Sequence, residues 1–128
     1  MARILIIDDD QDVRMVTCEV VRSAGHEVTL ASDGAEGLQL QREKSFDLVI
    51  TDLFMPVKEG VETICDIKKD FPEVKIIAIS GRSFQGHNYL PIAEALGVQV
   101  MLSKPIASSD LLKAVDDVLK ENNASASP

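Results

Sequence analysis

The sequence predicts an α/β fold in which a parallel five-stranded sheet carries helices on both faces. Five short aliphatic runs are separated by stretches whose apolar residues recur with helical spacing. Continuous aliphatic runs of this kind are typical of strands that are buried on both faces of a sheet. Because strands that are joined through helices form right-handed parallel crossovers, the pattern indicates a doubly wound fold.

Each element can be assigned from its own residues. The strands are expected at Arg3 to Ile7, Glu27 to Ala31, Asp47 to Thr51, Lys75 to Ile79 and Val98 to Leu102. The helical stripes are Val13, Val16, Val20, Val21 and Ala24, then Val61, Ile64, Cys65 and Ile67, and finally Leu111, Leu112, Val115, Val118 and Leu119. Asp10 and Asp33 are expected as N-caps, Gly25 at the end of the first helix, and Ser109 at the start of the last.

Length and composition predict one globular domain. The chain has 128 residues, and its apolar content of 45% is enough for a single core. We assign residues 1–121 to this domain and residues 122–128 to a disordered tail or the stub of a linker. No apolar run approaches the roughly 20 residues that a membrane span requires, and the N-terminus lacks a signal-peptide pattern. We therefore expect a cytoplasmic protein.

Charge and cysteine content narrow the classes of partner. The net charge of −8 argues against direct binding to nucleic acid, since such binding depends on clustered Lys and Arg. Cys18 and Cys65 belong to no metal-binding or Cys-x-x-Cys pattern. Both are expected to be buried, reduced thiols.

Polar residues follow four of the five predicted strands. These are the triplet Asp8-Asp9-Asp10, then Asp52, Ser80-Gly81 and Lys104-Pro105. In an open parallel sheet, ligands bind outside the carboxyl ends of the strands, so these groups are expected to share one edge. Three carboxylates there would repel one another unless a cation lay between them.

Mg²⁺ fits this donor set best, because it accepts one or two carboxylates and keeps positions for water and phosphate oxygens. Three carboxylates, one Mg²⁺ and Lys104 sum to zero charge, which would keep Asp52 ionised as a nucleophile. We expect Asp9 to bind the metal directly, Asp8 directly or through water, and the backbone carbonyl of Phe54 to complete the ligands. Lys104 would neutralise charge on a transferring phosphoryl group, and Ser80 would donate a hydrogen bond to it.

At these residues the chain resembles the receiver domains of two-component response regulators, similar to the chemotaxis regulators. The shared motifs are Ile-Leu-Ile-Ile-Asp8-Asp9-Asp10, Val-Ile-Thr-Asp52-Leu-Phe-Met-Pro56, Ile-Ala-Ile-Ser80-Gly81 and Lys104-Pro105, in the same order along the chain. The resemblance implies a flavodoxin-like three-layer sandwich with strand order 2-1-3-4-5 and often a cis Lys104-Pro105 bond.

The resemblance also implies a function in phosphorelay signalling. Asp52 would accept a phosphoryl group from a histidine kinase or a histidine phosphotransfer protein, with Mg²⁺ bound. The domain would be a switch that assists its own phosphorylation and dephosphorylation, not an enzyme. It would act as a monomer or a weak phosphorylation-dependent dimer and signal to a further protein partner.

Two features depart from the family pattern. Met101 stands three residues before Lys104, where the family commonly has a Tyr or Phe whose ring rotates on activation. The segment from Ser80 to Lys104, with Arg82 to Tyr89, is slightly longer than usual. We therefore expect the signal to pass through this segment without an aromatic rotor.

Other functions fit these residues less well. Asp8-x-Asp10 resembles the nucleophile motif of haloacid-dehalogenase-like phosphatases, but the further acidic pair that they require is matched only by Asp116-Asp117 in a helical stretch. An EF-hand loop starting at Asp8 would need Gly where Val13 stands. A flavodoxin-like FMN site would need a phosphate loop in place of the acidic triplet. A receiver that is not phosphorylated and acts only as an interaction domain remains the main rival.

Overall fold

The structure is a computed structural model that describes residues 2–53, 60–80 and 95–126 of the chain. Its five strands form one parallel sheet in the order β2-β1-β3-β4-β5. The elements in chain order are β1 (Arg3–Ile7), α1 (Gln11–Ser23), β2 (Glu27–Ala31), α2 (Gly34–Lys44), β3 (Leu48–Asp52), α3 (Gly60–Asp70), β4 (Lys75–Ser80), β5 (Val100–Ser103) and α5 (Ser108–Ala126). The predicted doubly wound topology is confirmed.

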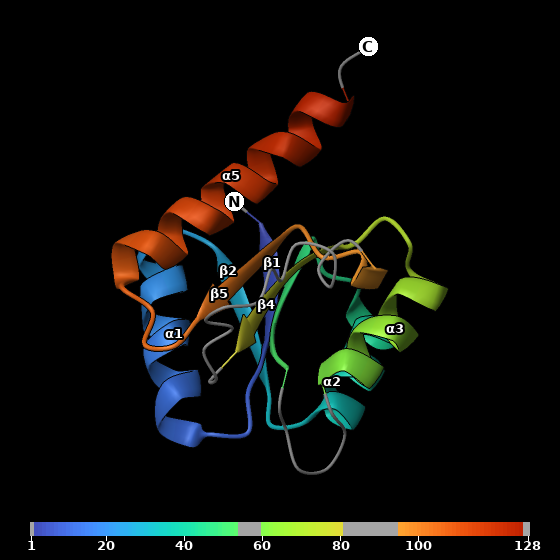
Figure 1. Cartoon of the computed structure of the whole chain (residues 1–128), viewed down its shortest axis with the longest axis horizontal. Coiled ribbons are helices and arrows are strands. Elements are labelled where there is room, and N and C mark those ends of the chain that lie inside the picture. The colour runs from blue at the N-terminus through green and yellow to red at the C-terminus, as the bar shows by residue number, and fades with distance from the viewer. Residues whose placement is uncertain (1, 54–59, 81–94, 127–128) are drawn as a thin grey trace.

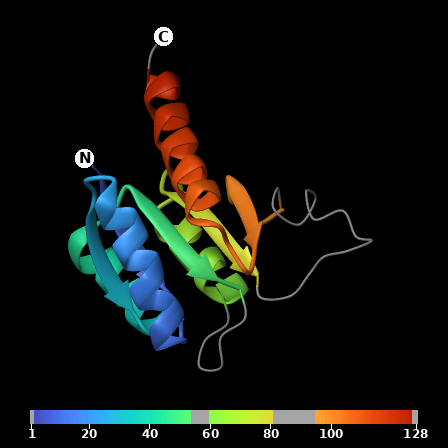
Figure 2. The same cartoon turned by 90° about the vertical axis from the view of Figure 1, so that its left-hand side faces the viewer.

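The molecule has three layers, with α1 and α5 on one face of the sheet and α2 and α3 on the other (Figures 1 and 2). Alternate residues of each strand supply two separate cores. In β1, for example, Leu5 and Ile7 pack toward α2 and α3, whereas Ile4 and Ile6 pack toward α1 and α5. Strands that bury both faces are rich in aliphatic residues, which is why β1, β3 and β4 contain nearly continuous aliphatic runs.

The predicted helix stripes are correct in position but wrong in part of their membership. Among the described residues of α1, the buried side chains are Thr17, Cys18 and Val21, while 60% of Val16 is exposed. In α3, Ile64 and Ile67 are buried but Cys65 is exposed, so the prediction of a buried Cys65 is wrong. The helix–sheet contact lies about one residue from the predicted stripe, a shift that the spacing of apolar residues alone does not resolve.

The helix ends follow the predicted capping chemistry. The Asp10 carboxylate accepts hydrogen bonds from the N–H groups of Asp12 and Val13, and Asp33 accepts one from Glu36. Gly25 has a φ of 93°, the left-handed conformation that favours glycine just after a helix. α5 begins at Ser108, one residue before the predicted start. In the described part of the chain, no helix is both long and apolar enough to span a membrane.

Gly60, the first residue of α3, makes the closest approach of a helix to the carboxyl end of β3. A Cβ atom at this position would overlap the main-chain oxygen of Asp52 and lie 2.6 Å from the Cα of Leu53. The Gly60 N–H also donates a 2.9 Å hydrogen bond to the carbonyl of Leu53. Only glycine therefore allows α3 to start beside Asp52.

We expect Gly60→Ala to lower the free energy of unfolding by about 2 kcal/mol or more, because main-chain atoms must move to admit the methyl group. Gly25→Ala is the matched control: it meets no atom within 4 Å and adds only the strain of a positive φ, about 1 kcal/mol. Urea unfolding of both variants measures the difference. Equal losses would contradict the steric explanation.

Candidate functional site

The polar residues after the strands are held in register by hydrogen bonds that extend the sheet beyond its strands. The N–H of Asp8 donates to the carbonyl of Ala31 (3.2 Å), and the N–H of Leu53 donates to the carbonyl of Ile79 (2.8 Å). The N–H of Lys104 donates to the carbonyl of Ser80 (2.8 Å). Each bond joins a residue at or next to the site to the neighbouring strand. The sheet itself therefore places Asp8, Asp52 and Lys104 at one edge.

Three carboxylates meet at this edge. One oxygen each from Asp8, Asp9 and Asp52 lies within 4.8 Å of the others. The side chains of Asp8 and Asp52 are only 4% and 6% exposed, whereas Asp9 is exposed. Two buried carboxylates next to one exposed carboxylate form a set of oxygen donors that suits a hard divalent cation.

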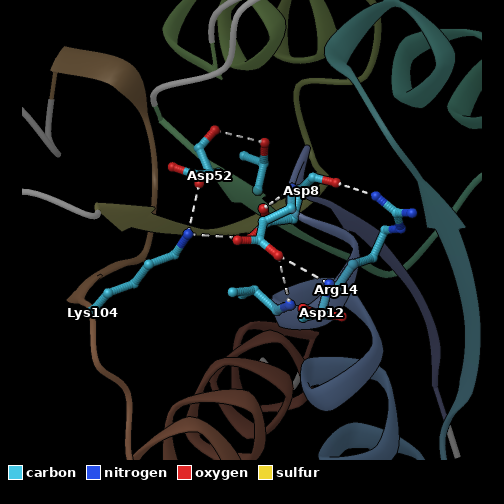
Figure 3. A network of polar contacts seen from close by, with 8 residues as sticks. Asp8, Asp12, Arg14, Asp52 and Lys104 are labelled. Carbon is cyan, nitrogen blue, oxygen red and sulfur yellow. Dashed lines mark hydrogen bonds and ion pairs between the residues drawn. The ribbon is translucent and has the colours of Figure 1, made fainter.

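Lys104 is the cation that the chain itself supplies to this cluster. Its Nζ lies 2.9 Å from Oδ2 of Asp52 and 3.4 Å from Oδ2 of Asp8 (Figure 3). The peptide bond that follows, Lys104-Pro105, is cis, as the resemblance implied. One ammonium group thus faces two buried carboxylates, which leaves the protein's own charges unbalanced at this site.

The unbalanced charge affects the pKa values of Asp8 and Lys104. Burial raises the pKa of Asp8, and the charge of Asp52 raises it further, against the opposing effects of the Asp10 N–H and Lys104. Burial acts to lower the pKa of Lys104, but the hydrogen bond with Asp52 and the charges of both carboxylates outweigh it and leave this pKa raised. Lys104 therefore stays protonated, while the ionised form of Asp8 is disfavoured without a further cation.

The loop between β1 and α1 fixes Asp8 from several directions. Its Oδ1 accepts a 2.9 Å hydrogen bond from the N–H of Asp10, whose own side chain caps α1. Its main-chain oxygen accepts a 2.7 Å hydrogen bond from Nη1 of Arg14. Asp10 thus has the capping role that the sequence predicts.

Ser80 and Met101 lie where the sequence predicts them. Ser80 ends β4, is 1% exposed and pairs in register with Ser103 of β5. Met101 is buried in β5, opposite Ala78. The predicted metal ligand Phe54 and the proposed signalling segment from Arg82 to Tyr89 lie outside the described residues.

Three residues near the site were missed by the sequence analysis. The sequence does carry a signal for Arg14, because a cation near the positive end of a helix dipole is unusual. Gly60 could not be found from the sequence, because the requirement for glycine there arises only from the close approach of α3 to β3. Thr51 is fully buried, and its Oγ1 donates a 3.1 Å hydrogen bond to the carbonyl of Asp52.

A groove of about 570 Å³ adjoins Lys104 on the face of the molecule that carries α1 and α5. Its lining residues are Asp12, Val13, Val16, Thr17, Val20, Lys104, Pro105, Ile106, Ser108 and Leu111. Val16 and the neighbouring Met15 are the most exposed large apolar side chains of the described residues. An apolar surface therefore lies directly beside the acidic cluster.

The residues that other functions would need are not gathered at this site. Asp116 and Asp117 lie on α5, where they form i,i+4 ion pairs with Lys120 and Lys113. Glu19, the last ligand of an EF-hand loop, is an exposed residue of α1. Neither the phosphatase nor the calcium-binding pattern is assembled among the described residues.

We expect Asp8→Asn to raise the melting temperature by several degrees at neutral pH without divalent cations, because it removes a buried charge that faces Asp52. The raised pKa of Asp8 means that the folded protein binds this proton more tightly than the unfolded chain does. Its ionisation therefore costs stability at neutral pH, and the cost disappears as the pH falls through the folded-state pKa. The difference between variant and wild type should accordingly shrink toward about pH 4. A variant less stable than the wild type at neutral pH would contradict this account.

Comparison with known proteins places the chain in a family. Residues 4–116 match the response regulator receiver domain. The response regulator receiver protein CpdR of Brucella abortus is 32% identical over 119 residues, which are 93% of this chain and 98% of CpdR. The transcriptional regulatory protein GlrR of Escherichia coli is also 32% identical, but the match covers 94% of this chain and only 27% of GlrR. The chain therefore spans about a quarter of some relatives and nearly the whole of others.

Solved structures show the same similarity. A CheY-like receiver domain protein from Methanospirillum hungatei superposes with a TM-score of 0.89 at 28% identity, covering 98% of each chain. Chemotaxis protein CheY4 of Vibrio cholerae gives a TM-score of 0.83 at 28% identity, covering 92% of this chain and 98% of that one. The chain belongs to the response regulator receiver domains of two-component signalling.

Proposed function

We propose that the chain is a phosphorylation switch in which Asp52 accepts a phosphoryl group from a histidine kinase or a histidine phosphotransfer protein. The observation that carries this proposal is the position of the Asp52 carboxylate, which is buried at the end of the central strand and 2.9 Å from Lys104. It is also grouped with the carboxylates of Asp8 and Asp9. A nucleophile, a fixed cation and two further acids thus share one site.

The transfer step can be written in terms of these residues. An oxygen of Asp52 forms a bond to phosphorus while the bond from phosphorus to the donor's imidazole nitrogen breaks, and that nitrogen keeps the electron pair. Lys104 is placed to offset the negative charge on the phosphoryl oxygens. Ser80, at the end of the adjacent strand, is the proposed hydrogen-bond donor to the transferred group. The product is an acyl phosphate on Asp52.

The donor set fits Mg²⁺, which would be held by Asp8, Asp9, Asp52 and, by resemblance, the carbonyl of Phe54. Carboxylate oxygens are ligands that this hard cation accepts, and one exposed acid leaves room for water and phosphate oxygens. When bound, Mg²⁺ supplies charge neutralisation for an anionic nucleophile that meets an anionic donor. It would also remove the electrostatic penalty that the raised pKa of Asp8 reflects.

Receiver domains are signalling switches and not classical enzymes. We propose that the same residues assist hydrolysis of the acyl phosphate, so that the domain contributes to both its phosphorylation and its dephosphorylation. The complete set of Asp8, Asp9, Asp52 and Lys104 argues against the rival function, a receiver that is never phosphorylated. Such a domain would have no need to keep two buried carboxylates beside one lysine, since their repulsion costs stability.

Receiver domains work with histidine kinases and often with effector domains. For this chain, the apolar groove supports docking of the phosphodonor, because it is lined in part by Lys104, whose Nζ lies 2.9 Å from the proposed acceptor Asp52. GlrR is named a transcriptional regulatory protein, and this chain matches only 27% of its length. We propose that the chain acts in the cytoplasm, as a monomer or a weak phosphorylation-dependent dimer, and signals to a further protein partner.

Treatment with a small-molecule phosphodonor such as acetyl phosphate should add one phosphoryl group to the intact protein only when Mg²⁺ is present. We expect Asp52→Asn to abolish this mass gain, because it removes the nucleophile, and Asp9→Ala to reduce it by about tenfold or more. Asp33→Asn, which changes an acidic cap away from the site, is the control and should label normally. Labelling that persists in Asp52→Asn or in EDTA would refute the proposal.

The phosphorylation signal is proposed to leave the site through β4 and β5 without an aromatic rotor. Ser80 and Ser103 are paired at the ends of β4 and β5. Met101 is buried two residues before Ser103 in β5. A flexible thioether can repack with little preference between two states, so the change should be a redistribution of backbone conformations after Ser80.

NMR spectra with and without a phosphoryl mimic such as beryllofluoride test this route. We expect shifts at Ser80, Met101 and Lys104 and in the segment from Arg82 to Tyr89, with small changes in β2 as the internal control. Shifts confined to Asp8, Asp9 and Asp52 would show that the proposed route is wrong.

A further inference from the structure

The charge of Arg14 lies where it opposes both the dipole of its own helix and the binding of a metal cation. It lies in the second turn of α1, close to the positive end of the helix dipole, where a cation is disfavoured. It also lies next to Asp8 of the Asp8, Asp9 and Asp52 cluster, whose negative charge attracts it but where its own charge would oppose the binding of a metal cation. A compensating contact should therefore explain its presence.

That contact is a single short hydrogen bond. Nη1 of Arg14 donates to the main-chain oxygen of Asp8 at 2.7 Å, and Arg14 lies on the side of Asp8 opposite to Lys104 (Figure 3). The Arg14 N–H also donates to the Asp10 carbonyl at 2.9 Å, so the residue is anchored to the loop at both its backbone and its side chain. The guanidinium group thus reaches from α1 back to the end of β1.

The bonded oxygen belongs to the peptide group that joins Asp8 to Asp9. Because a peptide group is planar, fixing the carbonyl of Asp8 also fixes the direction of the N–H and Cα of Asp9. The Asp9 side chain is exposed, and among the described residues no hydrogen bond or ion pair is recorded for its carboxylate. Asp8, in contrast, is held through its side chain by both Asp10 and Lys104. Asp9 therefore depends on its backbone for its position.

We propose that Arg14 is a positioning residue that aims the Asp9 carboxylate into the metal site by locking the Asp8–Asp9 peptide group. This inference rests on the proposed function, in which Asp9 is a metal ligand. In this role Arg14 strengthens Mg²⁺ binding by positioning a ligand, whereas its positive charge alone would weaken Mg²⁺ binding. Outer groups that orient metal ligands typically change metal affinity by 10–100-fold when they are removed.

The opposite signs make the test decisive. If Arg14 acted only through its charge, Arg14→Met and Arg14→Gln would bind Mg²⁺ more tightly than the wild type. If it positions Asp9, both variants should bind about tenfold more weakly, although each loses a repelling charge. Both replacements are good helix formers, so α1 should be preserved, and two variants guard against a folding defect in one. Arg14→Lys, which retains a donor and the charge, should be intermediate.

The measurement is the Kd for Mg²⁺ of the unphosphorylated protein by isothermal titration calorimetry, together with the ¹⁵N–¹H shifts of Asp9 and Asp10. Arg22→Met is the matched control, because Arg22 is an exposed residue in the last turn of the same helix. It should leave the Kd unchanged and the Asp9 amide unshifted.

Each result has a distinct meaning. Weaker Mg²⁺ binding and a shifted Asp9 amide in the neutral Arg14 variants would support the inference. Unchanged or tighter binding in a folded Arg14→Met or Arg14→Gln protein, including one of lowered melting temperature, would overturn it while leaving the proposed function intact. A wild-type protein that binds no Mg²⁺ would instead overturn the metal role in the proposed function, and the inference with it.

Discussion

The electrostatic balance between Lys104 and the carboxylates of Asp8 and Asp52 is the constraint on which the site depends. One ammonium group cannot neutralise two buried acids and the exposed Asp9 beside them. Burial and the second carboxylate raise the pKa of Asp8, which means that the folded protein tolerates this charge at a cost. A buried arrangement with this cost is useful when a cation and a phosphoryl group complete it, since both change the balance of charge at the same place. We therefore propose that the site responds to two ligands of opposite charge, a metal cation and a phosphoryl group.

The sheet supplies the precision that this balance needs. Asp52 ends the central strand, Asp8 follows the adjacent strand β1, and Lys104 follows the edge strand β5. Hydrogen bonds that continue the ladder past the strand ends keep these residues in register, and Gly60 allows α3 to start against the backbone of Asp52. Because the two cores pack against both faces of the sheet, a shift in one of these backbone segments would have to be transmitted through closely packed side chains. The same rigidity is what could convert a local charge change into a signal.

Much of this organisation could be predicted from the sequence, for reasons that are specific to the fold. Strands buried on both faces are rich in aliphatic residues, so β1, which is buried from Ile4 to Ile7, was located at its observed bounds. In parallel sheets functional residues follow the strands, so Asp8, Asp9, Asp52, Ser80 and Lys104 could be selected from the residues after each run. Strand order and the cis bond after Lys104 came from the family resemblance, because neither spacing nor composition determines them.

What could not be predicted depends on packing between distant segments. The exposure of Val16 and Cys65 reflects the rotation of α1 and α3 on the sheet, which apolar spacing defines only to within about one residue. The role of Arg14 depends on a hydrogen bond to a main-chain oxygen six residues earlier, and a backbone acceptor leaves no mark in a sequence. The need for Gly60 arises from a close approach of two elements. Side-chain pattern predicts elements well but does not predict contacts to the backbone.

The central claim is that the buried carboxylate of Asp52, at the end of β3 and paired with Lys104, is the group that takes up phosphate. Reductive trapping with borohydride tests it most directly, because borohydride converts an aspartyl phosphate to homoserine and leaves free carboxylates unchanged. After phosphorylation in the presence of Mg²⁺, peptide mass mapping should find homoserine at position 52 and unmodified aspartate at positions 8, 9 and 10. Homoserine at any of those three positions, or none at position 52 in a protein that has gained phosphate, would contradict the account.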